Sequence, residues 1–327
     1  MLRFIIRRTF LMIITLWVIS LIVFVVIQLP PGDYLTTLAI NYEKSGWPTE
    51  QAMFDALRIR YGLDKSVFEQ YTIWITNYLK GDMGYSFQWK KDVNTLIWER
   101  LFLTLALSTT SLILTWLISL PIGVYSALRQ HSMGDYIFTF LGFIGVSIPE
   151  FMLALFLMFL AFDKFGMDVG GLFSPQYVDA AWSIGKFIDL LKHVWLPAII
   201  LAMAGTAGYI RTLRANLLDE LKKPYVITAR AKGIPYRRLL LKYPIRIALN
   251  PFISSIAYIF PRLISGATII SVVMNLPTTG PLLLGALQSQ DMYLAGSFIL
   301  LFSIITVIAT FLSDLLLAAL DPRIRYY

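Results

Sequence analysis

Six long apolar segments separated by polar loops form the main pattern of this chain. Each approaches or exceeds the roughly 20 apolar residues that an α-helix needs to cross a bilayer, a length that core helices of soluble proteins seldom reach. They cover about residues 9–29, 101–128, 136–162, 193–210, 247–274 and 293–320. The pattern predicts an all-α integral membrane protein, with one transmembrane domain of six helices over residues 1–327.

The composition agrees with this class and changes how the charge is interpreted. Hydrophobic residues make up 57% of the chain and charged residues only 15%, far from the balance of a soluble domain. The formal net charge of +8 does not indicate nucleic-acid binding, because no soluble domain remains to display a basic surface once the apolar segments are removed. Membrane topology explains the charge better.

The positions of Lys and Arg predict the orientation in the membrane. Basic residues gather in the segments that face the cytoplasm if both termini are inside, whereas the loop over residues 30–99 has no basic excess. We therefore expect that loop to be extracytoplasmic. Within it, Val67, Tyr71, Trp74 and Tyr78 recur at helical spacing and predict an amphipathic helix on the outer face.

Three tryptophans of the outer loop could contact a ligand. Trp74, Trp89 and Trp98 have the chemistry to stack on sugar rings, but an aromatic belt at the membrane interface explains them better. We therefore interpret them as interfacial residues and keep sugar stacking as the alternative.

The chain lacks the residues that most catalytic and metal sites need. It has no cysteine, and its two histidines, His131 and His193, are far apart and without an acidic cluster, so we expect no metal site and no catalytic residues. A GxxxxGK[ST] phosphate loop is also absent, which excludes ATP binding by that route. We expect no cofactor in this chain.

The polar segment over residues 212–246 is the most informative part of the chain. Ile227 to Pro251 contains six basic residues and no acid, although it lies between two apolar segments. Pro224 should interrupt a preceding helix, and a short second helix should end at Gly233 in a left-handed cap, with Pro235 preventing its continuation. This pattern predicts a cytoplasmic helix, turn and helix, which has the form of a docking element.

Two partners are compatible with such a segment. Lys and Arg next to a membrane span commonly bind anionic lipid headgroups, and charge alone does not exclude that interpretation. The small residues Ala229, Ala231 and Gly233, followed by Pro235, favour another protein, because they allow its backbone to approach closely.

At these residues the chain resembles a known family, the inner-membrane permease subunits of binding-protein-dependent ATP-binding-cassette (ABC) importers, in their dipeptide and oligopeptide branch. Residues 228–233, Arg237, Arg238 and residues 248–251 resemble the coupling-loop motif of that family. The resemblance covers nearly the whole chain, and its other motifs occur in order: the N-terminal RFIIRR, Pro31-Gly32-Asp33, Gly62-Leu63-Asp64, Gly81-Asp82-Met83-Gly84-Tyr85-Ser86, Ser147-Ile148-Pro149 and Asp321-Pro322-Arg323-Ile324-Arg325-Tyr326.

The resemblance implies a site that couples this chain to an ATPase. Its residues would be Thr228, Ala229, Arg230, Ala231, Lys232, Gly233, Pro235, Arg237 and Arg238. The general motif of such importers begins Glu-Ala-Ala, whereas Thr228, Ala229 and Arg230 stand here, so an acidic contact with the ATPase is not carried over. Arg262 and the NLPTTGP sequence at residues 275–281 also depart from a typical peptide permease and bear on substrate class.

The resemblance also implies the fold, the partners and the location. It implies the architecture of a type I ABC importer permease with cytoplasmic coupling helices, in the cytoplasmic membrane of a bacterium or archaeon. A second homologous permease, two ATPase subunits that bind ATP and magnesium, an extracytoplasmic solute-binding protein and membrane lipid would be its partners. The cargo would be short peptides or oligosaccharides, moved by alternating access.

Ionisable and polar residues inside the spans are the candidates for a translocation path. Glu150 and Arg262 either pair with each other or the partner permease, or contact the substrate; Asp314 is interpreted as part of a structural pair. The candidate path residues are Ser147, Glu150, Ser254, Tyr258, Arg262, Ser265 and Thr268. Ser and Thr at these positions could equally serve as hydrogen bonds between helices.

Two other classes remain as alternatives. An ion-coupled secondary transporter should show inverted repeats and a chain of buried carboxylates, and a membrane enzyme should show a catalytic cluster. Neither pattern is clear in the sequence, and neither class explains the basic segment over residues 212–246.

Overall fold

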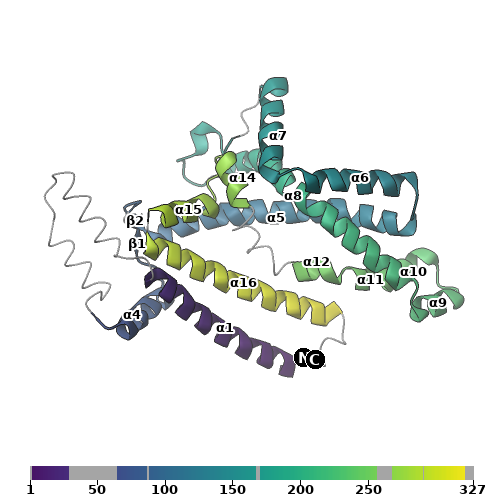
Figure 1. The fold of residues 1–327 in the computed structure, drawn as a ribbon, viewed down its shortest axis with the longest axis horizontal. Helices are drawn as coiled ribbons and strands as arrows, with labels where there is room; N and C mark the ends of the chain where they lie inside the picture. The colour runs from purple at the N-terminus through teal and green to yellow at the C-terminus, as the bar shows by residue number, and fades with distance from the viewer. Residues whose placement is uncertain are drawn as a thin grey trace.

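The computed structural model describes residues 2–28, 65–86, 88–166, 170–255, 267–289 and 291–320. Four long helices, α1 (Leu2–Gln28), α5 (Val93–Leu128), α8 (Ile184–Leu221) and α16 (Met292–Leu320), extend along the molecule (Figure 1). Among the described residues, three helices are long and apolar enough to cross a membrane, or up to five if each of two bent pairs is one span. The all-α membrane fold is confirmed, while the count of six spans stays a prediction.

The third apolar segment does not form one straight helix, as the span over 136–162 assumed. It divides into α6 (Met133–Ser147) and α7 (Glu150–Phe165), which meet at an angle of 98°. Pro149 explains the break, because proline disfavours helical conformation in the residue before it, and Ile148 is extended, with φ −88° and ψ 125°. Helix α7 therefore points away from the other long helices (Figure 1).

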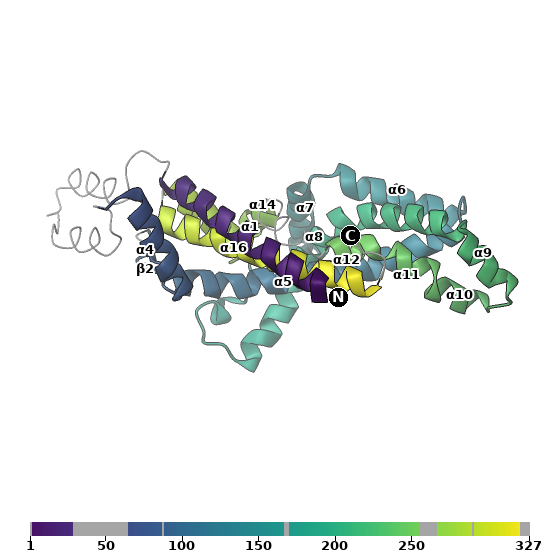
Figure 2. The same cartoon turned by 90° about the horizontal axis from the view of Figure 1, so that it is seen from below.

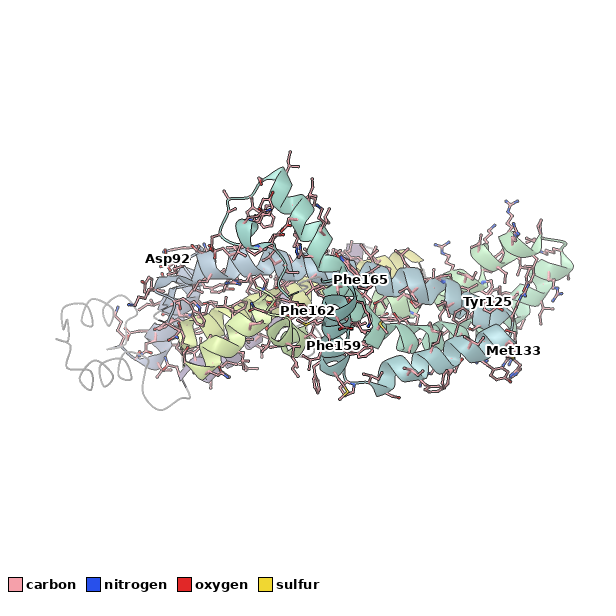
Figure 3. All side chains as sticks on the ribbon, turned by 90° about the horizontal axis from the view of Figure 1, so that it is seen from above. Asp92, Tyr125, Met133, Phe159, Phe162 and Phe165 are labelled. Atoms are coloured by element: carbon pink, nitrogen blue, oxygen red, sulfur yellow. The ribbon has the colours of Figure 1, made fainter. Side chains whose placement is uncertain are left out.

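Figure 3 shows how α5 and α6 connect the two ends of the molecule. Asp92, immediately before α5, and Tyr125, near the end of α5, lie at opposite ends, and Met133 at the start of α6 lies near Tyr125. The exposed side chains of Phe159, Phe162 and Phe165 follow α7. Helix α6 thus returns from one end of α5 toward the middle of the molecule before the chain turns into α7.

The fourth apolar segment is part of a helix of 38 residues, α8, much longer than the predicted span over 193–210. It bends by 50° between Met203 and Gly205. The helix expected before Pro224 is the last part of α8, and its side chains Leu213 and Leu217 are fully buried. One helix therefore joins the fourth apolar segment to the basic segment.

The fifth predicted span, 247–274, lies partly outside the described residues. Its described parts are α11 (Pro244–Ala248), α12 (Asn250–Ser254) and α14 (Ala267–Val273). A further helix, α15 (Thr279–Gln288), follows where the sequence predicted only a loop, and it packs against α14, α16 and α5. The Thr279 amide donates a hydrogen bond of 2.9 Å to the Thr104 hydroxyl of α5, which fixes the start of α15.

The loop over residues 30–99 contains the helix that its aromatic spacing predicted, α4 (Val67–Leu79), which begins with a capping box between Ser66 and Glu69. The interfacial interpretation is wrong for Trp74, because only 9% of it is exposed and its ring packs against Phe24 and Tyr78. The sequence of residues 50–60 also predicts a short helix that ends near Gly62, and these residues lie outside the described ones.

A short antiparallel hairpin, β1 (Tyr85–Ser86) and β2 (Lys91–Asp92), lies beside α4 at the same end of the molecule (Figure 1). Asp291, fully buried, accepts a hydrogen bond of 2.6 Å from the Ser86 hydroxyl and another from the Leu294 amide. The hairpin is thereby fixed to the start of α16.

The segment over residues 170–183, with a 3-10 turn at Pro175–Tyr177, folds onto the start of α8. The Asp189 carboxylate accepts hydrogen bonds of 2.7 Å from both the amide and the hydroxyl of Ser174, and the Lys186 ammonium donates one of 2.6 Å to the Ala180 carbonyl. The Nδ1 atom of His193 lies 3.7 Å from the Oδ1 atom of Asp189. The sequence pattern did not predict this acidic neighbour of His193.

Helices α1 and α16 pack against each other through a cluster that includes Val23, Phe24, Phe298 and Phe302. Asp314 of α16 forms an ion pair of 3.1 Å with Arg8 of α1, which confirms the structural role expected for Asp314. The N-terminal part of the first helix is thus tied to the end of the last long one.

Candidate functional site

The basic segment folds as the predicted helix, turn and helix: α9 (Pro224–Ala231) and α10 (Tyr236–Lys242). Proline is tolerated in the first turn of a helix, which explains why α9 begins at Pro224. Gly233 has φ +73°, and its amide bonds to the Arg230 carbonyl, while the Ile234 amide bonds to the Ala229 carbonyl. Gly233 therefore forms the left-handed turn that ends α9.

The inward face of this element is apolar and packs on the ends of two long helices. Its buried side chains are Val226, Ala229, Leu239 and Leu240. They form one cluster with two partly buried residues, Leu128 at the end of α5 and Leu221 at the end of α8. Burial of this face fixes α9 and α10 to α5 and α8. A force on the element would reach both long helices directly.

The outward face carries nearly all of the predicted coupling residues. Those exposed are Thr228, Arg230, Ala231, Lys232, Gly233, Pro235, Arg237 and Arg238. Ala229 is the exception, because it is 6% exposed and points into the cluster, so it cannot offer a small surface to another protein. Three exposed apolar side chains, which the sequence did not single out, belong to the same element: Ile227, Tyr236 and Leu241.

The element lies at one end of the molecule, and α4 with the hairpin lies at the other (Figure 2). Helix α10 continues through Tyr243 into α11, which packs against α8, and then into α12, which packs against α16. The element is therefore joined to the start of the fifth predicted span as well as to α5 and α8.

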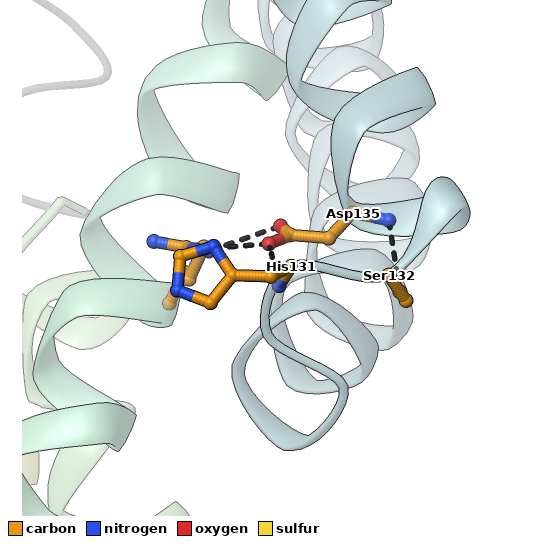
Figure 4. A network of polar contacts seen from close by, with 4 residues as sticks. His131, Ser132 and Asp135 are labelled. Carbon is orange, nitrogen blue, oxygen red and sulfur yellow. Dashed lines mark hydrogen bonds and ion pairs between the residues drawn. The ribbon is translucent and has the colours of Figure 1, made fainter.

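A buried ion pair holds the nearby corner between α6 and α8 (Figure 4). The Arg214 guanidinium donates two hydrogen bonds, of 3.0 and 2.9 Å, to the two carboxylate oxygens of Asp135, which is only 2% exposed. Asp135 also accepts from the His131 amide at 3.0 Å, and its own amide donates to the Ser132 hydroxyl. Two-point contact fixes both distance and orientation between the helices.

Only part of the candidate translocation path lies within the described residues. Ser147 and Glu150 lie on either side of the break at Pro149, and the Ser147 hydroxyl donates to the Phe143 carbonyl of its own helix. Thr268 is in α14, which packs against α7.

The hydroxyl of Ser254, at the end of α12, donates a hydrogen bond to the Asn250 carbonyl. Tyr258, Arg262 and Ser265 lie outside the described residues. The path therefore stays a prediction.

Comparison with known proteins assigns the chain to a family. The family described as binding-protein-dependent transport system inner membrane component matches residues 119–326, and the N-terminal region of such membrane components matches residues 1–108. The chain belongs to this family. It is an ABC importer permease of the peptide branch and a multi-pass inner-membrane protein.

Individual relatives align along their whole lengths. The permease is 35% identical over 328 residues to the oligopeptide transport system permease protein AppB of Bacillus subtilis, with 100% of each chain covered. It is 32% identical over 327 residues to a putative peptide permease protein of Brucella ovis, with 99% of each covered. It is 29% identical over 326 residues to the glutathione transport system permease protein GsiC of Escherichia coli K12, with 100% of each covered.

The features of this permease that sequence reasoning missed are contacts between distant segments. Asp135 and Arg214 are 79 positions apart, and Thr104 and Thr279 are 175 apart, so no local spacing reveals either pair. The buried positions of Ala229 and Trp74 also depend on which face of a short helix packs against its neighbours.

Proposed function

We propose that this permease is the membrane subunit of an ATP-driven importer of short peptides that works by alternating access. The observation that carries the proposal is the exposed basic element of α9 and α10, whose apolar face is seated on the ends of α5 and α8. Short peptides are the proposed cargo because the names of the relatives specify oligopeptides, peptides and glutathione. Oligosaccharides are the alternative cargo.

The proposed assembly contains a second homologous permease, two ATPase subunits and an extracytoplasmic solute-binding protein. ATP and magnesium would bind to the ATPase subunits, and this chain would hold no cofactor and perform no catalysis. The proposed orientation puts both termini and α9–α10 in the cytoplasm of a bacterium or archaeon. Helix α4 and the hairpin would then face outward, where the binding protein would dock.

The proposed mechanism uses the element as a rigid lever. Closure of the ATPase dimer would move α9 and α10 together, because their shared apolar cluster resists separation. The movement would pass to α5 and α8 through Leu128 and Leu221, and through α11 toward the fifth predicted span. Alternating access would follow as these helices change their angles to the rest of the bundle.

The residues proposed to line the path remain those that the sequence indicated. A lining of hydroxyl groups would let a polar peptide slide without holding it, so that the binding protein determines selectivity. Glu150 and Arg262 would pair with each other, with the partner permease or with the charged ends of the peptide.

The experiment is purification of the tagged permease from its native membrane in mild detergent, with the bound proteins identified by mass spectrometry. We expect an ATPase, a second permease and, with a stabilising substrate, a binding protein. A stable permease that purifies without any ATPase, and whose uptake follows an ion gradient, would support a secondary transporter instead.

A further inference from the structure

The docking element, which contains α9 and α10, carries only positive charges. Between Leu221 and Asn250 the sequence has no Asp or Glu and eight basic residues, all of them exposed: Lys222, Lys223, Arg230, Lys232, Arg237, Arg238, Lys242 and Arg246. Within the described ranges, no carboxylate lies within ion-pair distance of any of these groups. The nearby carboxylate of Glu220 instead accepts a hydrogen bond from the Tyr225 hydroxyl.

Apolar side chains are exposed among these cations. Ile227 on α9 is 59% exposed, and Tyr236 and Leu241 on α10 are 53% and 69% exposed. An interface that combines apolar anchors with surrounding charge is typical of protein partners, in which the anchors give affinity and the charges give specificity and speed of association.

We infer that the ATPase surface that receives α9 and α10 is a groove with an apolar floor and an acidic rim. This inference rests on the proposed function and adds the chemistry of the partner surface. Cations that leave water in an interface need opposite charges, because an unpaired buried charge costs several kcal/mol. Within the described part of the permease no carboxylate pairs with these cations, so we expect the partner to supply the opposite charges.

The geometry favours a protein groove over an anionic membrane surface. A helix that lies on a bilayer buries one continuous apolar face in the lipid. Here the main apolar faces of α9 and α10 are already buried inside the chain, through Val226, Leu239 and Leu240, and the three exposed apolar side chains lie among cations. The element also lies at the extreme end of the molecule, opposite α4 (Figure 2). Its charged side is thus available to a separate protein.

The test measures how firmly purified wild-type and variant complexes retain their ATPase subunits at rising salt concentration. For wild type, we expect dissociation to increase with salt, because screening weakens exposed charge pairs. Arg237→Glu with Arg238→Glu should weaken the binding of the ATPase subunits on the order of tenfold, so that they dissociate at lower salt than from wild type. Arg237→Lys with Arg238→Lys, which keeps the charge, should behave nearly as wild type.

Arg129→Glu is the matched control for position. Arg129 is exposed at the end of α5 but outside the element, so its reversal should leave ATPase retention unchanged. Elution of each variant as a single species, with wild-type yield, shows that the permease has folded. The same complexes are also tested for binding to phosphatidylglycerol vesicles and to phosphatidylcholine vesicles.

Each result has a definite meaning. The acidic groove is supported if the wild-type permease retains its ATPase subunits less firmly as salt rises, and if only the Arg237→Glu, Arg238→Glu variant loses them. Retention that neither salt nor charge reversal changes overturns the groove and leaves the proposed function standing. Variants that keep the ATPases but lose phosphatidylglycerol binding overturn it in favour of a lipid contact. Wild-type permease that holds no ATPase refutes the proposed function itself.

Discussion

Replacing Gly233 with tryptophan should separate ATP hydrolysis from transport while leaving membrane insertion intact. Gly233 has φ +73°, a conformation that costs a residue with a side chain about 1–2 kcal/mol. Apart from Gly233 and its two chain neighbours, no atom of the described residues lies within 4 Å of the position that a Cβ at Gly233 would occupy. Because Gly233 is also exposed, a large side chain can extend away from the permease. We therefore expect mainly backbone strain within the permease and a steric clash with the docked ATPase.

The two effects differ in size and can be separated. Gly233→Asn tests backbone strain, because asparagine tolerates the left-handed conformation better than other residues, and we expect nearly normal transport. Gly233→Trp adds bulk; overpacking a fitted interface costs about 1–3 kcal/mol, which is roughly a 5- to 150-fold loss in docking affinity. The permease alone should lose little thermal stability in either variant.

The assay is the amount of peptide taken up per ATP hydrolysed by the complex in proteoliposomes. For a second readout, ATPase retention, the control is Gly81→Trp. Gly81 also has a positive φ, of +90°, and open space at its Cβ, but it lies near the hairpin at the opposite end. ATPase retention should fall for Gly233→Trp and not for Gly81→Trp. Wild-type coupling in the Gly233→Trp variant would refute the view that this turn contacts the ATPase.

Three further substitutions test the contacts that organise the helices. Arg214→Ala leaves the buried Asp135 carboxylate unpaired and should cost about 3 kcal/mol, seen as a melting temperature several degrees lower in detergent; an unchanged melt would show that the pair is dispensable. Thr104→Val removes the acceptor of the Thr279 amide and should cost about 1–3 kcal/mol in the same melt, whereas Thr104→Ser should cost less. Pro149→Ala should let α6 and α7 straighten, which spin labels on cysteines introduced into the two helices would report as a longer distance; the native distance would mean that packing, not proline, holds the bend.

Features encoded by neighbouring residues were the ones that the sequence predicted well. Helix α4 follows from its aromatic spacing, and α9 with its turn follows from Pro224 and Gly233, because proline and glycine act on the backbone locally. The break at Pro149 had a signal too, but a hydropathy pattern averages over about 20 residues and merges two short helices into one span.

Features that depend on packing could not be obtained in this way. Helix α15 has only 10 residues, too few to register as a span, and it is positioned by Thr104 from far along the chain. The inward direction of Ala229 depends on where α10 packs, which no repeat in α9 specifies. The burial of Asp135 has no local signal, because its partner Arg214 lies 79 positions along the chain.

The proposed ATP-driven import is tested most directly by peptide uptake into proteoliposomes that contain the purified complex and ATP and hold no ion gradient. We expect uptake that requires internal ATP and the external binding protein and that stops when ATP is replaced by a non-hydrolysable analogue. Uptake without ATP, driven by an imposed ion gradient on the permease alone, would contradict it.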